Sequence, residues 1–435
     1  MENRTVPGVD APDGADGAAD RAAAGGQALL LGRQPLVDRD GLLCGFELGV
    51  RDGGGLWPDA LVAGLRDAGV RAALGGHKAL IDASRPLLFA DALFELAPER
   101  YMFELPPELE VDADLIARLV TLHRRRYRFV LDRVSDPGPS FAKLLPYAEA
   151  VKIDVGQGSE ALLRKLVDAL KTANKKLIAL NVETPERFEQ AKALGFVQFQ
   201  GYFFAHRHVS PARRVSAPRH ALLNLMQLLA TDPNVAQLEA ELKLNPVLVM
   251  HLMRLANTGE AGFGRQATTL REAIAATGTN RIARWTQILL YADGRKVALE
   301  NDPLVQLAAT RARFMELAAV ALPDADRRTV EAAFLVGALS LIDAVFGDPI
   351  AVTLDDLTVS PTVRAAILDR EGVLGALLDV IVGMERGDWP AVDDGCARLG
   401  GWPAGDAVKV TLKAAAWAAS ADYTMDTVGL GRFAD

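Results

Sequence analysis

An aspartate at the end of a hydrophobic run is the first feature of this sequence that points to chemistry. Residues 128–132 read Arg-Phe-Val-Leu-Asp, and a Pro-Gly-Pro loop follows at 137–139. Such a run is typical of a parallel β-strand that carries a carboxylate to the edge of a sheet where α/β folds place their sites. Asp132 is therefore a candidate metal ligand. Its neighbour Arg133 stays positively charged at any ordinary pH, which conflicts with a bound cation.

Other strand-like runs also end in a charged or amide side chain. In a barrel of parallel strands these ends meet on one rim, so their side chains are candidates for a shared pocket. Lys152 and Asp154 alternate along one run, so only one of them can face the interior. The further strand-end residues are Glu47, Asp82, Glu104, Lys152 and Gln200.

The strands that must position these residues alternate with helical patterns. A hairpin covers roughly 29–48, and later strand-like runs lie at 79–82, 101–105, 128–132, 150–154, 177–180 and 196–202. Repeated strand–helix alternation predicts parallel strands joined by right-handed crossovers. This many units predicts a closed, TIM-like (β/α) barrel.

The second half of the chain shows only helical patterns, so the predicted fold class is α/β plus all-α. Apolar residues recur at helical spacing through 235–256, 269–292, 303–322, 327–346, 361–385 and 404–420. The domains we expect are a disordered tail at 1–27, a barrel at 28–210, a linker at 211–217, a helical domain at 218–420 and a tail at 421–435.

The composition narrows the classes of partner. The chain has 435 residues and a net charge of −8, which disfavours non-specific binding to nucleic acid or to an anionic membrane. Two distant cysteines make a disulfide framework or a cysteine zinc site unlikely. We find no signal peptide and no apolar run long enough to span a bilayer, so we expect a cytoplasmic protein.

Short motifs in the first half resemble those of the EAL domain, the cyclic di-GMP phosphodiesterase fold. Their order and spacing carry the resemblance. They are Arg-Gln-Pro-Leu-Val-Asp at 33–38, Gly-Phe-Glu-Leu-Gly-Val-Arg at 45–51, Val-Lys-Ile-Asp at 151–154, Val-Glu-Thr-Pro-Glu at 182–186 and Gln-Gly-Tyr at 200–202.

The second half resembles an HDOD domain, a helical relative of HD-type phosphohydrolases. The matching segments lie at 245–248, 252–257 and 269–274. None of the six histidines is followed by aspartate, so the metal-binding His-Asp doublet of the HD enzymes is absent from the sequence. The joint architecture resembles the EAL–HDOD signal-transduction proteins of bacteria.

The resemblance implies a pocket on the barrel rim for metal and cyclic di-GMP. EAL domains bind two divalent ions through carboxylates and an asparagine, with a lysine assisting. Asp82 stands where the family has that asparagine, and the resemblance selects Lys152 as the inward-facing residue of its strand. The candidate pocket residues are Glu47, Arg51, Asp82, Glu104, Asp132, Lys152, Glu183 and Gln200.

Two departures from the family pattern argue against catalysis. Arg133 stands where the family has the second aspartate of a pair, and it places a cation near the expected metal. Leu180 stands where the family has a glutamate. The stretch between residues 51 and 79 is short for this family, so the barrel could also be trimmed, with fewer helices.

These observations lead to one expectation and two alternatives. We expect a non-catalytic scaffold, not an enzyme, that acts through protein partners in a cyclic di-GMP pathway, and a homodimer is compatible with this role. The first alternative is a receptor that binds cyclic di-GMP without hydrolysis. The second is a weak metal-dependent phosphodiesterase. We expect no cofactor, and Mg²⁺ or Mn²⁺ only if the altered site still binds metal.

Overall fold

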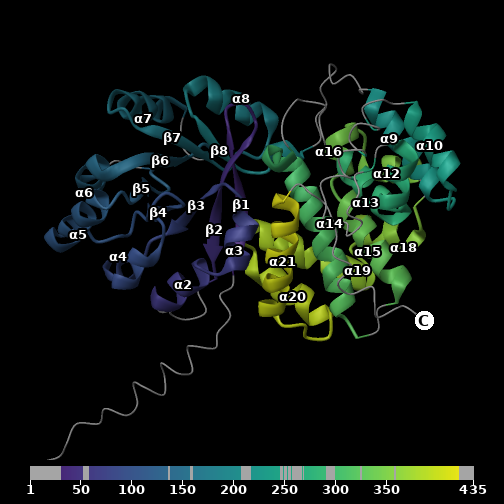
Figure 1. Ribbon diagram of the computed structural model, residues 1–435. Coiled ribbons are helices and arrows are strands. Elements are labelled where there is room, and N and C mark those ends of the chain that lie inside the picture. The colour runs from purple at the N-terminus through teal and green to yellow at the C-terminus, as the bar shows by residue number, and fades with distance from the viewer. Residues whose placement is uncertain are drawn as a thin grey trace, which may run out of the picture.

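The computed structural model contains a barrel followed by a helical half that packs against one side of it (Figure 1). The structure describes residues 31–51, 58–135, 138–156, 160–206, 217–244, 269–290, 299–323, 326–356 and 359–420, and single positions at 248, 252, 256 and 267. The predicted tails at 1–27 and 421–435 lie outside the described residues. So does nearly all of the predicted linker at 211–217.

Eight strands close into a barrel in sequence order, as the sequence predicts. β1 runs antiparallel to both of its neighbours, β2 and β8, and all the other pairs are parallel. The strands are β1 Leu31–Asp38, β2 Leu43–Val50, β3 Lys78–Asp82, β4 Tyr101–Leu105, β5 Arg128–Leu131, β6 Ala148–Asp154, β7 Lys176–Leu180 and β8 Gln198–Gln200.

The strand register brings polar residues together at one end of the barrel. Asp82 lies opposite Glu104 on the neighbouring strand, and Gln34 lies opposite Glu47. Below this rim the interior of the barrel is apolar, where Val130 packs in a small cluster with side chains from four other strands. These apolar side chains fill the lower barrel, and the polar side chains lie above them at the rim.

Every parallel crossover among the described residues contains at least one α-helix, so the trimmed barrel that we considered does not appear. α4 and α6 are only 5 and 6 residues long. Capping residues fix several helix starts, as Asp112 does when it accepts a hydrogen bond from the Leu115 amide. The helices are α2 Pro58–Leu65, α3 Ala68–Leu74, α4 Arg85–Phe89, α5 Ala113–Arg124, α6 Pro139–Leu144, α7 Glu160–Thr172 and α8 Pro185–Leu194.

The second half is helical, with more breaks than the apolar pattern predicts. The segment of helical periodicity at 361–385 is divided into two helices at Arg370, whose φ is 57°, and the segment at 269–292 is divided at Gly278, whose φ is 77°. A positive φ interrupts helical geometry, and hydrophobic periodicity does not reveal it. The segment at 327–346 is likewise two helices, α15 Arg327–Leu339 and α16 Ile342–Phe346.

One central helix organises the helical half. α14, Pro303–Ala321, is buried on nearly all sides, which fits its content of apolar and small residues. No helix in the described part of the chain has both the length and the apolar character to cross a membrane. The other helices are α9 Ala217–Leu229, α10 Val235–Lys243, α12 Leu270–Thr277, α13 Thr279–Leu289, α17 Ile350–Asp356, α18 Pro361–Leu368, α19 Gly372–Arg386, α20 Trp389–Arg398 and α21 Ala404–Ala419.

The two halves share a close interface. α21 packs along α3, and α19 packs against β1 (Figure 1). At Gly32 the approach is so close that an added Cβ would lie 2.8 Å from the carbonyl oxygen of Met384. The side chain of Arg33 crosses from β1 to hydrogen-bond Thr310 of α14 at 3.2 Å. Burial lowers the pKa of Arg33 to about 10, in keeping with its place inside the interface.

Candidate functional site

A cavity of about 580 Å³ opens at the rim where the polar strand ends converge. Its size falls in the range of small-molecule sites. Of the residues singled out in the sequence, those that line it are Glu47, Asp82, Asp132, Arg133, Lys152, Leu180, Glu183 and Gln200. Residues from six strands, or from the positions just after them, thus meet at one end of the barrel, as their strand-end positions predict.

Lys152 is the central cation of this site. Its ammonium group is 1% exposed and lies 2.6 Å from Glu104 Oε1 and 3.8 Å from Asp132 Oδ1, and it also donates a hydrogen bond to Glu47. Burial by itself lowers the pKa of Lys152, but the carboxylates of Glu104, Glu47 and Asp132 outweigh burial and raise it above the usual range. The lysine therefore remains charged.

Glu104 lies at the bottom of the site and is fully buried. Burial raises its pKa well above the usual range, while the charge of Lys152 opposes the shift. Neither carboxylate oxygen accepts a hydrogen bond of good geometry from the described residues, although Lys152 lies close to Oε1. A buried oxygen without a hydrogen bond is costly, so this carboxylate has capacity for a further positive partner.

Three carboxylates are grouped closely enough to share a metal ion. One oxygen each of Asp82, Glu104 and Asp132 lies within 4.8 Å of the others. Hard divalent cations such as Mg²⁺ prefer oxygen ligands of this kind. The donor set and the unpaired oxygen of Glu104 therefore fit a divalent cation, with Asp82 and Asp132 as the other ligands.

The pKa of Asp82 lies above that of an ordinary aspartate. The surrounding protein raises its pKa to about 6 by desolvation, and the charges of Glu47 and Asp132 add to this shift. Lys152 and Arg133 oppose it. The carboxyl group of Asp82 therefore changes charge near neutral pH, unlike an ordinary surface aspartate.

Arg133 pairs with its own neighbour and not with the buried carboxylate. Its Nε lies 2.8 Å from Asp132 Oδ2, while its side chain is 59% exposed. The sequence left pairing with Asp132 or with Glu104 open, and the structure selects Asp132. The φ of Arg133 is 45°, in the left-handed region that residues other than glycine rarely adopt. Oδ1 of Asp132 remains on the side of Lys152, at 3.8 Å from its ammonium nitrogen, and Arg133 itself still lines the cavity.

Leu180 and Glu183 lie on the opposite side of the cavity. Leu180 is nearly buried and contributes an apolar surface, whereas Glu183 is exposed, with His206 Nε2 at 4.0 Å. The family glutamate that Leu180 replaces has no substitute carboxylate on the same strand.

Several lining residues were not among the candidates drawn from the sequence. Gln34 accepts a hydrogen bond of 2.6 Å from Gln200, and Asn181 donates one of 2.8 Å to Asp154. Gln34 and Asp154 belong to matched motifs, and so could have been selected. Arg386 also lines the cavity, and it comes from α19 of the helical half. No local sequence signal connects Arg386 with the barrel.

Arg51 is the candidate that the structure places elsewhere. It is not among the residues that line the cavity. Its guanidinium instead makes a two-pronged ion pair with Asp393 of α20, at 2.7 and 2.6 Å. The partner lies 342 positions away in the sequence, so spacing could not reveal it. Arg51 connects the two halves of the chain.

Comparison with known proteins finds relatives that match most of this chain, one of them named a cyclic di-GMP phosphodiesterase. No protein-family model matches it. Cyclic di-GMP phosphodiesterase CdgJ of Vibrio cholerae is 26% identical over 388 residues, which cover 85% of this chain and 87% of CdgJ. Uncharacterized protein YuxH of Bacillus subtilis is 22% identical over 388 residues, 86% of this chain and 93% of YuxH. A standalone EAL protein of Vibrio cholerae in its c-di-GMP-bound form is 23% identical, with a TM-score of 0.32, and covers 41% of this chain and 91% of that protein.

The expectation that this protein is not an enzyme is contradicted. A relative that matches both halves of the chain is named a cyclic di-GMP phosphodiesterase. The acidic cluster of Asp82, Glu104 and Asp132 is also intact despite Arg133. The expectation gave too much weight to one charge, because the sequence does not reveal that Arg133 pairs with Oδ2 of Asp132 while the three carboxylates stay grouped.

The identity of the barrel follows from its site and its relatives together. The motif residues Glu47, Glu104, Asp132 and Lys152 converge on the rim of a closed eight-stranded barrel. The match to CdgJ extends over this barrel and over the helical half. The amino-terminal half of this chain is an EAL-like domain.

Proposed function

We propose that this protein binds cyclic di-GMP in the rim cavity and hydrolyses it as a metal-dependent phosphodiesterase. The single observation that carries the proposal is the cluster of Asp82, Glu104 and Asp132 beside the buried ammonium of Lys152, at the bottom of a cavity of ligand size. The name of the relative CdgJ supports the same reaction.

The reaction adds one water molecule across one phosphodiester bond. The water oxygen bonds to phosphorus, the bond to the leaving sugar oxygen breaks, and a proton passes to that oxygen. Divalent ions held by the three carboxylates would supply an activated water and neutralise phosphate charge. Lys152 orients Glu47 and Glu104 and offers positive charge close to the phosphate.

The direct test is a turnover assay with cyclic di-GMP and Mg²⁺ or Mn²⁺. We expect conversion to the linear dinucleotide, loss of conversion with EDTA, and recovery when metal is restored. Absence of both turnover and binding at high protein concentration would disprove the proposal. Binding without any turnover would disprove the hydrolytic part.

Replacing Arg133 by aspartate should increase activity. The change removes a cation that pairs with Asp132 and adds a carboxylate at the rim. A favourable charge change close to a divalent ion is worth on the order of 1 kcal/mol when screened by solvent, so we expect an increase of about tenfold in Mn²⁺ affinity or in kcat/KM. Arg187→Asp on α8 is the control. An unchanged metal affinity and rate would show that Arg133 does not limit the site.

Metal binding should weaken as the pH falls through about 6. The pKa of Asp82 is raised to about 6, so its carboxyl group is protonated below that pH and charged above it. Because a metal competes with the proton, Mn²⁺ affinity should rise from pH 5 to pH 7. Calorimetric titration at several pH values would measure this. Asp82→Asn should flatten the profile, and a wild-type affinity that is independent of pH would contradict the assignment.

The prediction of an HDOD-type helical half with protein partners remains a proposal. So does the homodimer. Neither is needed for the reaction on the barrel rim.

A further inference from the structure

An arginine from the helical half lies at the mouth of the barrel cavity. Arg386 is the last residue of α19, its side chain is exposed, and it lines the same cavity as Lys152 and the carboxylate cluster. Among the described residues no hydrogen bond or ion pair is made by the Arg386 side chain. A free cation at the mouth of an anion-binding cavity is available to a ligand.

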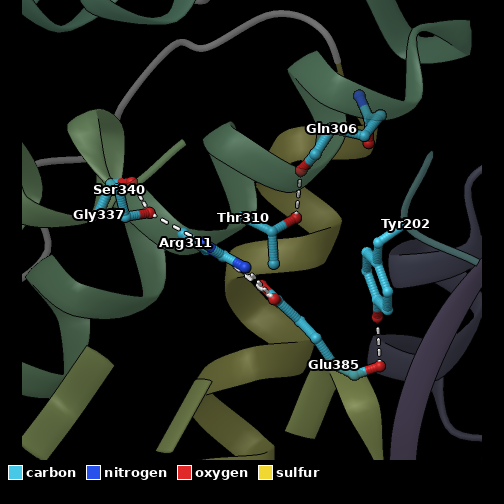
Figure 2. A network of polar contacts seen from close by, with 7 residues as sticks. All are labelled: Tyr202, Gln306, Thr310, Arg311, Gly337, Ser340 and Glu385. Carbon is cyan, nitrogen blue, oxygen red and sulfur yellow. Dashed lines mark hydrogen bonds and ion pairs between the residues drawn. The ribbon is translucent and has the colours of Figure 1, made fainter. Parts of the chain in front are cut away.

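Glu385, the residue before Arg386, accepts hydrogen bonds through both its side chain and its main chain (Figure 2). The buried carboxylate of Glu385 accepts hydrogen bonds from Arg311 Nε at 2.9 and 3.0 Å and from Arg311 Nη2 at 2.7 Å. The main-chain carbonyl of Glu385 accepts a hydrogen bond from the hydroxyl of Tyr202, which belongs to the barrel. The backbone at the end of α19 is therefore fixed to both halves of the protein.

The turn that ends α19 also helps to fix the backbone at Arg386. Gly387 adopts a left-handed conformation with φ 68°, and its amide hydrogen-bonds to the Met384 carbonyl at 3.3 Å. The helix ends at Arg386 for this reason, and the close approach of Met384 to Gly32 holds that end against β1. Arg386 is thus presented on a rigid turn, although its side chain is exposed.

The distribution of charge in the cavity indicates what Arg386 would bind. Carboxylates gather around the buried Lys152, where metal would neutralise them, and the exposed part of the lining carries Arg133 and Arg386 together with Glu183. A guanidinium matches a phosphate oxygen pair in geometry and charge. We propose that Arg386 contacts a phosphate of the bound dinucleotide, so that the helical half completes the ligand site of the barrel. This inference rests on the proposed function.

The test compares Arg386→Ala with wild type in the full chain. Loss of a charge-assisted hydrogen bond at an exposed rim should weaken cyclic di-GMP binding about tenfold. We expect the Kd from calorimetry and the KM from turnover to rise together, with kcat changed less than threefold. Arg386→Lys should recover part of the affinity, and the binding of the alanine variant should depend less on salt. Arg328→Ala is the matched control, because Arg328 is an exposed arginine of the same half that does not line the cavity.

The outcomes separate the inference from the proposed function. If wild type binds and R386A binds equally well, the inference is overturned and the proposed function stands. If wild type neither binds nor hydrolyses cyclic di-GMP, both fall. If R386A also lowers the melting temperature, Arg386→Lys decides: recovery of affinity supports a phosphate contact, and no recovery in a stable lysine variant overturns it.

Discussion

Replacing Lys152 by methionine should lower kcat for cyclic di-GMP hydrolysis about 10²–10³-fold, the usual effect of removing one preorganised electrostatic group. The lysine is buried, and its ammonium group contacts Glu104 and Glu47 and lies 3.8 Å from Asp132. Methionine retains the length of the side chain and removes the charge. The carboxylates then repel one another and lose the orientation that the ammonium group imposes. Steady-state turnover with saturating Mn²⁺ would measure the loss.

The same variant should show a pH-dependent loss of stability. Burial already raises the pKa of Glu104, and removing the opposing charge of Lys152 raises it further. A carboxyl group whose folded pKa lies above its unfolded pKa destabilises the fold as pH rises between the two values. The melting temperature of the variant, relative to wild type, should therefore be lower at pH 8 than at pH 5. Lys143→Met on the outer helix α6 is the control, and equal activity of both variants would show that Lys152 has no role in the reaction.

Replacing Arg311 by methionine should reduce the free energy of unfolding by about 3–5 kcal/mol, the usual cost of leaving one member of a buried ion pair alone. The side chains of Arg311 and Glu385 are each 7% exposed, and three short contacts join them. Arg311 also donates a hydrogen bond of 3.1 Å to Ser340 (Figure 2). Denaturant unfolding would measure the change.

A double variant distinguishes an unpaired charge from lost packing. Arg311→Met combined with Glu385→Met removes both charges and should recover a large part of the stability. Arg364→Met is the control, because Arg364 and Asp355 form an exposed pair whose loss should change the stability far less. If Arg311→Met cost no more than this control, the pair would not anchor the end of α19.

The sequence by itself determined the elements and most of the residues on the barrel rim. Strand–helix alternation predicts the barrel, because side chains that alternate in and out must be buried on both faces by the crossover helices. A polar residue at the end of each parallel strand must lie on one rim, which is why Glu47, Glu104, Asp132 and Lys152 meet. Periodicity missed the helix breaks at Gly278 and Arg370, since a positive φ leaves no mark on the apolar pattern.

Only the tertiary structure decided which charged side chains line the cavity. The type of residue at position 133 suggested a lost metal site, but Arg133 pairs with one oxygen of Asp132 and the acidic cluster stays intact. Arg51 was a candidate pocket residue and instead pairs with Asp393, while Arg386, which the sequence did not single out, lines the cavity. Contacts between residues hundreds of positions apart depend on how the barrel and the helical half pack against each other. The local sequence pattern of either half does not reveal that packing.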